Sequence, residues 1–494
     1  MSLVTAPEQP EFTRLAQRYP LVPVWTDLAG DPCPVAVFQR FGDKGAVLLE
    51  RSDHQGRYAV IGLDPVTTLV SRGGAVTWTG EPICPVPAGA SLAQTLREVT
   101  RLLRAPAIPQ TPVTAGAIGV LGGDALRPPP ARPDRDPPPE AVLTFPAAMV
   151  ICDPDRQRLR LVVHVRVGPG RPADELYAEA RDRLRRLVAR LGPVDGLRPE
   201  PVSVPAAAPD VDSDIPDAEF QTMIEAAHRR VRAGEVRQVN ISRRFVAPAT
   251  ADPLAVYRVL RVSNPAPYLF LLRLPGVTLV GASPQGLIRV RDDEVRTYVI
   301  AGTRPRGADP ESDAALAAEL RGDPKERAEH GMLVDLALAD LGPVARPGSV
   351  RVSDRERLVR YSRVMHLTSE ITGALAPGRT PVDALAAVFP PGPVTGTPRA
   401  AALRVIDEIE PRPRGLYGGA VGYLGLAGDL DLCLGIRTLQ FPDRPGSAYV
   451  QAAAGVVADS VPEREVAESR AKASGLFTAL AGAAMVTVAE GEPT

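Results

Sequence analysis

The sequence has few cysteines, and their spacing excludes two common roles for this residue. Only four of the 494 residues are cysteine, namely Cys33, Cys84, Cys152 and Cys433, and no two of them form a CxxC pair. Structural zinc sites and disulfide frameworks need cysteines at characteristic close spacings, so we expect neither. Scattered cysteines fit a reducing compartment, and we therefore expect a cytoplasmic protein.

An excess of charge and a long apolar run are also missing. The formal net charge at pH 7 is −1, whereas binding to nucleic acid or to a membrane surface usually requires a basic excess. No apolar stretch approaches the ~18 residues that a membrane-spanning helix needs. The opening residues, MSLVTAPEQPEF, lack the basic and apolar segments of a secretion signal. We therefore expect no nucleic acid and no membrane among the partners.

The chain does have enough apolar residues, 45% of the total, to form a large core. A helical pattern at 173–191 precedes a proline-rich segment at 193–216, which predicts a boundary near residue 210 between domains 1–210 and 211–490. A second proline-rich segment, 127–139, predicts an exposed loop. Helices and strands follow one another without regular alternation, which indicates the α+β class.

One predicted helix carries several acids. The segment DPKERAEHGMLVDL starts with Asp323, a good N-cap, and Pro324 suits the first turn. Glu326 and Glu329 lie three residues apart and therefore share a helix face. The apolar spacing predicts a buried stripe made of Ala328, Met332, Leu333 and Leu336.

A second acidic pair lies in DSVPEREVAESRAKA, residues 459–473. Pro462 begins a predicted helix in which Glu465 and Glu468 share a face, with Lys472 one turn after Glu468. Each pair by itself is most often a solvated surface feature. Two such helices could instead hold Mg²⁺, which takes hard oxygen ligands and often needs only one or two protein carboxylates. The spacing leaves both readings open.

A series of segments gives the C-terminal half a recognisable order. They are AGEVRQVNIS, VGASPQGL, IAGTRPRG, DPKERAEHGMLVDL, YSRVMHLTSE, TGTPR, YGGAVGYL, GIRTL and QAAAGVVADSVPEREVAESRAK. This order, over residues 215–485, resembles the chorismate-utilising enzymes, and most closely anthranilate synthase component I and the related aminodeoxychorismate synthase component I. The segment VLLERSDHQGRYAVIGLDP (47–65) resembles the family's N-terminal domain. The resemblance implies large, mainly antiparallel sheets with flanking helices, and makes 211–490 the chorismate-binding catalytic domain.

The resemblance also implies Mg²⁺-dependent chemistry on chorismate, which carries two carboxylates. It places magnesium ligands at Glu329 and Glu468, with further acids at Glu326 and Glu465. It places His366 near the ring, where it would position and protonate groups. The positions that would bind the substrate are Gly302, Thr303, Tyr417, Arg437, Ala453, Ala454, Gly455 and Lys472. Two cations in this set suit a dianion.

Two further positions bear on the nucleophile. Family branches that add water carry a lysine base at position 238, whereas this chain has Gln238, which cannot take a proton. Aminodeoxychorismate synthases carry a nucleophilic lysine in the IKGT motif, whereas this chain has Ala301. Both residues favour direct attack of ammonia at C2, followed by loss of pyruvate to give anthranilate. The segment QVNIS points instead toward the aminodeoxychorismate branch.

One departure from the family pattern leaves several outcomes open. The family's SPE motif supplies a glutamate as general acid, whereas this chain reads SPQ with Gln285, which cannot deliver a proton. General acid catalysis contributes about 10²–10⁴-fold, so turnover is slow unless His366 or a metal-bound water replaces the acid. The alternatives are a synthase that retains the pyruvyl group and forms 2-amino-2-deoxyisochorismate, an aminodeoxychorismate synthase, and a non-catalytic chorismate-binding scaffold.

No glutaminase module is visible, so the resemblance implies a separate glutamine amidotransferase subunit that supplies ammonia. Family members of tryptophan biosynthesis bind tryptophan between two segments that correspond here to LLERS (48–52) and NPAPYL (264–269). The candidate effector pocket comprises Glu50, Arg51, Pro267, Tyr268 and Leu269. We expect the Arg51 guanidinium to crowd this pocket and repel an amino-acid ammonium. Weak tryptophan inhibition, as in a specialised-metabolite pathway, would follow.

Overall fold

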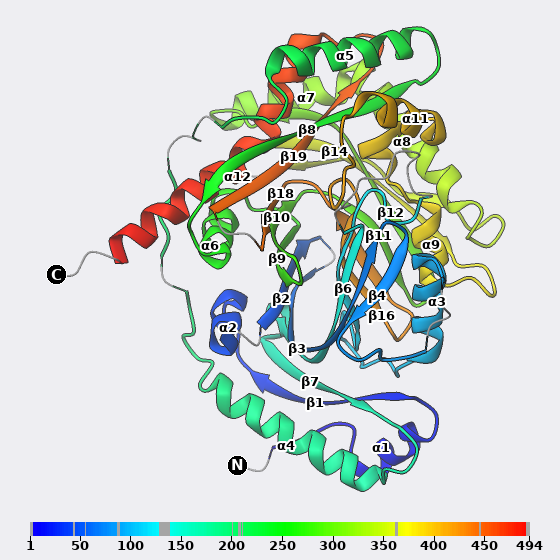
Figure 1. Cartoon of the computed structure of the whole chain (residues 1–494), viewed down its shortest axis with the longest axis vertical. Helices are drawn as coiled ribbons and strands as arrows, with labels where there is room; N and C mark the ends of the chain where they lie inside the picture. Colours follow the sequence, from blue (N-terminus) through cyan, green and yellow to red (C-terminus); the bar gives the residue numbers. More distant parts are fainter. Residues whose placement is uncertain are drawn as a thin grey trace.

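The computed structural model describes the chain except for residues 1–2, 43–44, 55, 86–88, 128–138, 200, 206–208, 210, 361–363, 444–445 and 491–494. Most of the predicted loop at 127–139 and residue 210 itself therefore lie outside the described residues. Figure 1 shows the arrangement of helices and strands. Within the part of the chain that the structure describes, no helix is both long and apolar enough to span a membrane.

The strands join through antiparallel pairings into one large sheet. They are β1 (Leu21–Ala29), β2 (Gly45–Asp53), β3 (Gly56–Arg72), β4 (Ala75–Thr79), β5 (Gly116–Leu121), β6 (Ala141–Asp153), β7 (Arg158–Arg166), β8 (Gln238–Ala249), β9 (Tyr268–Leu274), β10 (Val277–Ser283), β11 (Gly286–Arg291), β12 (Glu294–Pro305), β13 (Arg351–Arg360), β14 (Val364–Ala374), β15 (Gly396–Thr397), β16 (Ala420–Gly425), β17 (Leu430–Leu434), β18 (Thr438–Pro442) and β19 (Gly446–Val456).

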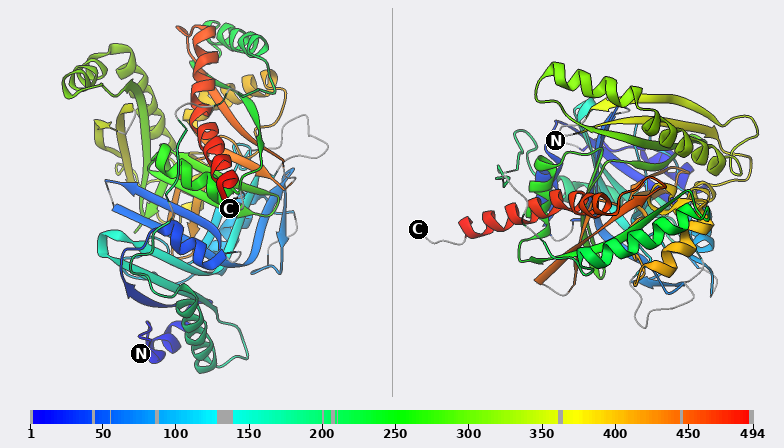
Figure 2. Two further views of the ribbon diagram at one scale, coloured as in Figure 1. Left: turned by 90° about the vertical axis from the view of Figure 1, so that its left-hand side faces the viewer. Right: turned by 90° about the horizontal axis from the view of Figure 1, so that it is seen from above.

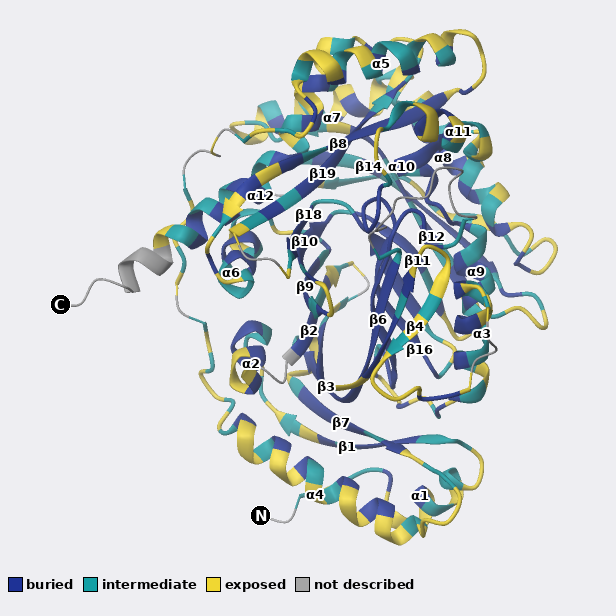
Figure 3. Cartoon of the chain, viewed as in Figure 1, coloured by how far each residue is buried: buried dark blue, intermediate teal, exposed yellow. Residues whose placement is uncertain are grey.

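The helices cover the outer faces of the strands. They are α1 (Gln9–Ala16), α2 (Pro34–Phe41), α3 (Leu92–Leu102), α4 (Ala173–Leu191), α5 (Asp217–Arg232), α6 (Pro253–Ser263), α7 (Pro310–Gly322), α8 (Pro324–Leu341), α9 (Pro381–Ala387), α10 (Gly392–Thr395), α11 (Arg399–Ile409) and α12 (Pro462–Glu490). In Figure 3 their outward faces are largely exposed, whereas central strands such as β6 are buried. This separation agrees with the predicted α+β class of large antiparallel sheets with flanking helices.

The sheet runs without interruption across the predicted boundary at residue 210. β2 pairs with β9, and β5 pairs with β16, so strands from the N-terminal half are bonded to strands from the C-terminal half. Phe12 and Phe245 belong to the same buried core. The division into domains 1–210 and 211–490 stays a prediction, with extensive packing between its two parts.

Two groups of strands in the C-terminal half position the candidate site. β8 and β19 pair with each other and are flanked by α5, α11 and α12. β12 and β14 pair with each other and are flanked by α7 and α8. Figure 2 shows the two groups as neighbouring lobes above the N-terminal strands. The site therefore draws residues from both lobes.

The predicted stripe on α8 was wrong in part. Ala328 is exposed, and Met332 and Leu336 are only half-buried, whereas Leu333 is buried. The buried face of α8 packs against β12 and β14 and consists of His330, Leu333, Val334, Ala337 and Leu341. His330 is the first buried residue of this face, and its Nε2 forms a hydrogen bond of 2.7 Å with the Ser369 hydroxyl on β14. Apolar spacing could not show that a histidine takes the first buried position.

Candidate active site

The predicted metal-binding glutamates come from two helices far apart in the sequence. α8 begins where the Asp323 carboxylate caps the helix by accepting hydrogen bonds from the backbone N–H groups of Lys325 and Glu326. Burial raises the pKa of Glu329, and the charges of Glu326 on α8 and Glu468 on α12 raise it further. Glu329 on α8 therefore lies within the electrostatic range of Glu468 on α12.

The remaining glutamate, Glu465, is also held in an unfavourable setting. Burial raises its pKa to about 7, and the Glu468 carboxylate adds to the rise, whereas a hydrogen bond with Ser460 opposes it. Its Oε2 atom is buried and finds no hydrogen-bond partner among the described residues. Glu468 forms an ion pair of 2.6 Å with Lys472 on the next turn. Burial and the neighbouring carboxylates thus both disfavour the charged forms of Glu329 and Glu465.

This donor set fits Mg²⁺. Carboxylate oxygens are the ligands that Mg²⁺ prefers, and a divalent cation would relieve the repulsion that raises these pKa values. No three His, Cys, Asp or Glu side chains of the described ranges converge as a closed metal site would require. Mg²⁺ commonly uses one or two protein carboxylates and completes its shell with water and substrate oxygens. Glu329 and Glu468 are therefore suited to hold it together with a bound substrate.

Two cations lie beside the acidic cluster. The Arg437 guanidinium donates a hydrogen bond to the backbone carbonyl of Lys472. The Lys472 ammonium in turn donates to the backbone carbonyl of Ala453 at 2.9 Å. Burial raises the pKa of Tyr417 to about 12, and the charge of Arg437 acts against this rise, so the two side chains are neighbours. Arg437, Lys472 and Tyr417 thus offer positive charge and a neutral hydroxyl next to Glu468.

The strand pair β12–β14 supplies the predicted histidine, His366. A bulge between Ala301 and Thr303 places Thr303 opposite His366. The His366 Nδ1 lies 3.2 Å from the Gly302 carbonyl and 2.9 Å from the Thr303 hydroxyl. Because a carbonyl can only accept, Nδ1 carries the proton and Nε2 carries the lone pair. Burial lowers the pKa of His366 and the Arg437 charge adds to this, so the ring is neutral at pH 7 and suited to accept a proton at Nε2.

Gly302 connects this bulge to the acidic cluster. Its φ of 82° lies in the left-handed region that favours glycine. A Cβ at this position would lie 3.3 Å from Glu326 Oε2 and 3.0 Å from Leu320 Cδ1. The close approach requires glycine and fixes the distance between the backbone of β12 and the acids of α8.

The predicted residues on β8 and β19 face one another. Asn240 pairs with Gly455, and a Cβ on Gly455 would lie 3.2 Å from Gln238 Nε2. Ala453 contributes its carbonyl to Lys472, as described above. Ala454 is fully buried in the core beneath α5 and α11, so it offers the site only its backbone. The structure thus brings Gln238 and Gly455 to one surface of the sheet.

Gln285 and Ala301 have other neighbours. Gln285 donates a hydrogen bond of 3.1 Å from Nε2 to the Tyr298 carbonyl. It lines a cavity of about 30 Å³ together with Leu333 and Asp340 of α8. Ala301 is buried in the core. The place of Gln285 beside the ring stays a prediction.

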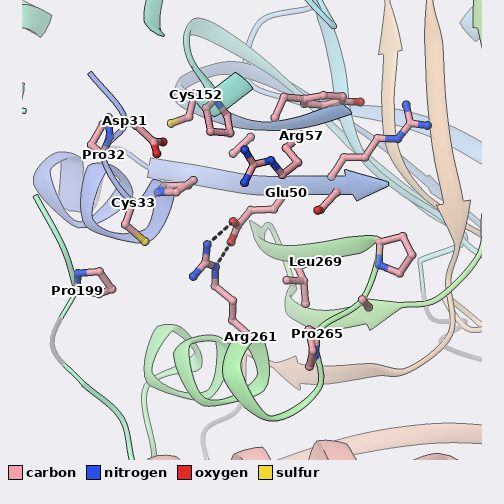
Figure 4. A pocket seen from close by; sticks show the side chains of 18 of the residues that line it. Asp31, Pro32, Cys33, Glu50, Arg57, Cys152, Pro199, Arg261, Pro265 and Leu269 are labelled. Atoms are coloured by element: carbon pink, nitrogen blue, oxygen red, sulfur yellow. Dashed lines mark hydrogen bonds and ion pairs between the residues drawn. The ribbon is translucent and has the colours of Figure 1, made fainter. Parts of the chain in front are cut away.

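Most of the candidate effector residues line a cavity of about 730 Å³, which Figure 4 shows from close by. Glu50, Arg51, Pro267 and Leu269 line it, whereas Tyr268 lines two smaller cavities. The Glu50 carboxylate is already bound, since it accepts hydrogen bonds from Arg261 at 2.7 and 3.0 Å and one from the Tyr257 hydroxyl.

The expectation that the Arg51 guanidinium crowds this cavity stays a prediction, and Arg51 is among the residues that line the cavity. The guanidinium is buried, and it donates hydrogen bonds of 2.6 Å to Asp431 and 2.6 Å to Asp53. These two carboxylates hold the guanidinium in one position. Weak tryptophan inhibition also stays a prediction.

Sequence reasoning missed two arginines that support the site. Arg304 forms ion pairs with Glu326 at 3.0 Å and with Asp323 at 2.7 Å, and so ties β12 to the start of α8. Arg414 pairs with Glu410 and donates to the backbone carbonyl of Asn240 on β8. The four-residue spacing of Glu410 and Arg414 was the only signal in the sequence for the second pair.

Comparisons with known proteins bear on the family and the fold of the chain. The family of chorismate binding enzymes matches residues 44–478. Anthranilate synthase component 1 of Bacillus caldotenax is 38% identical over 494 residues, covering 95% of this chain and 96% of that protein. The crystal structure of anthranilate synthase component I from Streptococcus pneumoniae TIGR4 has a TM-score of 0.72 and 31% identity, covering 86% of this chain and 93% of that one. The menaquinone-specific isochorismate synthase MenF from Escherichia coli shares the fold, with a TM-score of 0.68 over 96% of this chain and 98% of that one, at 20% identity. The resemblance predicted from the segment order is confirmed, and the chain belongs to the family of chorismate binding enzymes.

Proposed function

We propose that this enzyme aminates chorismate at C2 with ammonia, in a Mg²⁺-dependent reaction that forms anthranilate, pyruvate and water. The observation that supports the proposal is that the charges of Glu468 and Lys472 on α12 act on Glu329 of α8, while Glu468 pairs with Lys472 and Arg437 donates to the Lys472 carbonyl. An acidic cluster and two cations on one surface suit a divalent ion and a dianionic substrate, and would be costly without them. The curated relative and the crystal structure named above are both called anthranilate synthase component 1 or I.

The chain's own residues bind and orient the substrate. Arg437 and Lys472 pair with the substrate carboxylates, and Tyr417 adds a neutral hydroxyl donor. Glu329 and Glu468 would hold Mg²⁺, which would supply Lewis-acid charge to a ring carboxylate. Glu326 and Glu465 would support these ligands from the same helices. His366, beside the backbone of Gly302 and Thr303, would lie near the substrate ring.

We infer that ammonia is the nucleophile, because the chain has neither a base at position 238 nor a nucleophilic side chain at position 301. Gln238 cannot activate water as a base, and Ala301 cannot form a covalent adduct, whereas ammonia needs neither kind of help. After ammonia attacks C2, the new C–N bond leaves a proton to be removed from nitrogen, and the Nε2 lone pair of His366 can accept it. The C4 hydroxyl departs as water, and elimination of the enolpyruvyl group as pyruvate restores the aromatic ring. Gln285 can donate a hydrogen bond to a departing hydroxyl but cannot protonate it.

The ammonia would come from a separate glutamine amidotransferase subunit, because the relative's designation as component 1 fits an enzyme with a second component. We also infer a cytoplasmic location, which the scattered free cysteines support. Tryptophan biosynthesis and a specialised-metabolite pathway both remain compatible with this reaction.

A non-catalytic chorismate-binding partner is the second candidate, and Gln285 is the observation that favours it. A synthase that stops at 2-amino-2-deoxyisochorismate differs only in retaining the pyruvyl group. Product analysis separates these outcomes, since a binding partner leaves chorismate unchanged and the early-stopping enzyme gives a product that keeps all the carbon atoms.

The test uses the purified chain with chorismate, MgCl₂ and an ammonium salt, followed by product mass and anthranilate fluorescence. We expect anthranilate to form, chelation by EDTA to stop the reaction, and Glu468→Gln to reduce kcat/KM about 100-fold or more, as loss of a metal ligand does. Glu463→Gln is the matched control, because Glu463 lies five residues earlier on α12 and accepts a hydrogen bond from Gln221 at the surface. Absence of chorismate consumption by the wild type, or equal effects of the two variants, would contradict the proposal.

A further inference from the structure

A single guanidinium holds the junction between β12 and the acidic end of α8. Arg304 is the last residue but one of β12. Its Nε donates to Glu319 in the last turn of α7 at 2.8 Å, its Nη2 to Asp323, the N-cap of α8, at 2.7 Å, and its Nη1 to Glu326 in the first turn of α8 at 3.0 Å. Nη1 also donates to the Thr303 carbonyl at 3.0 Å. Because the guanidinium is planar and rigid, it fixes these acceptors relative to one another.

Both carboxylate oxygens of Glu326 are thereby turned toward β12. Oε1 accepts the hydrogen bond from Arg304, and the two side chains are only 24% and 18% exposed. Oε2 lies against the strand backbone, 3.3 Å from the place that a Cβ on Gly302 would take. The charge of Glu326 is therefore paired within the chain, in a position partly shielded from water.

Glu329, the next acid on this face of α8, is in a different state. It lies three residues after Glu326, a spacing that puts both side chains on one face of the helix. Glu329 forms no hydrogen bond or ion pair with any other residue that the structure describes. Two acids one turn apart thus differ, since an arginine holds one of them and the other is available to a cation.

This difference bears on which divalent ion the site accepts. Mg²⁺ requires near-ideal octahedral geometry, keeps several water molecules and commonly uses one or two protein carboxylates. Ca²⁺ is larger, takes about six to eight oxygen ligands in flexible geometry and binds more tightly as carboxylates are added. A freed Glu326 would add a third carboxylate to the pair formed by Glu329 and Glu468. That addition would favour Ca²⁺ much more than Mg²⁺.

We propose that Arg304 withholds Glu326 from the metal and thereby keeps the site selective for Mg²⁺ over Ca²⁺. The inference rests on the proposed Mg²⁺-dependent function and adds to it a residue that determines the choice of metal. Arg304 acts through Glu326 and is therefore a positioning residue. Its positive charge also repels any divalent ion, but this repulsion depends on charge alone and acts equally on Mg²⁺ and Ca²⁺. The ratio of the two dissociation constants therefore isolates the effect of the withheld carboxylate.

The test is calorimetric titration of the full chain with MgCl₂ and with CaCl₂, in the presence of chorismate and without ammonia, so that no amination occurs. We expect Arg304→Met to lower Kd for Ca²⁺ about tenfold or more and to change Kd for Mg²⁺ less than about threefold. The double variant Arg304→Met, Glu326→Gln should return the ratio of the two constants to the wild-type value, because the freed carboxylate is then missing. Arg306→Met is the matched control, since Arg306 directly follows β12 and pairs with Asp313 on α7 at 2.6 Å. We expect it to leave the ratio unchanged.

The outcomes separate this inference from the proposed function. If the wild type binds Mg²⁺ and Arg304→Met does not shift the ratio toward Ca²⁺, Arg304 contributes only charge or structure, and the inference is refuted while the amination stands. A double variant that keeps the altered ratio also refutes it, because Glu326 is then not the withheld ligand. If the wild type binds no Mg²⁺, the proposed metal dependence and the inference fail together. Should Arg304→Met not fold, Arg304→Gln, which keeps a hydrogen-bond donor without the charge, provides the same comparison.

Discussion

The ion pair between Arg51 and Asp431 joins β2 of the N-terminal half to β17 of the C-terminal half, and its removal should lower stability measurably. Both side chains are buried, with 3% and 2% exposed, and the shortest N–O distance is 2.6 Å. Asp431 also accepts hydrogen bonds from the Tyr58 hydroxyl at 2.9 Å and the Tyr268 hydroxyl at 3.1 Å. The Arg51→Met variant removes the cation and leaves this carboxylate buried.

The expected size follows from this geometry. Breaking a buried pair by removing one partner costs about 3–5 kcal/mol, because the remaining charge stays buried without compensation. The two tyrosine hydroxyls and Arg289, whose Nε lies 3.9 Å from an Asp431 oxygen, still stabilise this carboxylate, so we expect a value near the lower limit. Unfolding entropy is about 2.1 cal/(mol K) per residue, which gives roughly 1 kcal/(mol K) for the 494 residues of the chain. The melting temperature should therefore fall by about 3 °C.

The control is an exposed ion pair on a neighbouring strand. Arg57 on β3 pairs with Asp155 at 2.9 Å, but these side chains are 58% and 39% exposed. Exposed pairs contribute about 0.2–1 kcal/mol, so Arg57→Met should lower the melting temperature by about 1 °C or less. The double variant Arg51→Met, Asp431→Leu should be more stable than Arg51→Met alone, because it removes the uncompensated charge. Calorimetry checks all three. Equal effects of the two arginine variants, or a double variant less stable than Arg51→Met, would refute the reasoning.

Two other substitutions test the site. Gly302→Ala should cost about 1–2 kcal/mol through its left-handed φ, and should also raise the Mg²⁺ concentration that gives half-maximal activity about threefold or more, because the Cβ displaces Glu326. Gly234 is the control position, because its φ of 79° is similar but no atom lies within 4 Å of the place that a Cβ would take. Gly234→Ala should therefore lower stability without changing the Mg²⁺ requirement. An unchanged Mg²⁺ requirement in both variants would disprove the link to Glu326. Gln285→Glu should speed turnover about 10-fold or more if the missing proton donor limits the rate. Burial favours the protonated form of a glutamate at this position. The protonated side chain can still donate the hydrogen bond that Gln285 makes to the Tyr298 carbonyl. Gln285→Met, which restores no acid, should not speed turnover, and a Gln285→Glu rate at or below the wild type would remove the proposed limitation.

Local features of the sequence were sufficient for much of the fold. Asp323 and Pro324 predicted the start of α8, and Pro462 predicted the start of α12, because capping and the missing proline N–H act within one turn. The pattern at 173–191 predicted α4 with the bounds observed. The segment order predicted the family, and with it the residues of the site. The predicted buried stripe on α8 was wrong at Ala328, because which face of α8 is buried depends on where β12 and β14 lie.

The sequence by itself determined the helices that carry the acids, the family and the absence of a base at Gln238 and of a nucleophile at Ala301, because these depend on residue type and local spacing. Only the tertiary structure decided that the charge of Glu468 on α12 acts on Glu329 of α8, and that the Arg51 guanidinium pairs with the buried Asp431. Each of these depends on strand register and on the packing of distant segments, since the direction of a buried charged side chain is set by the partner that the fold places within its reach.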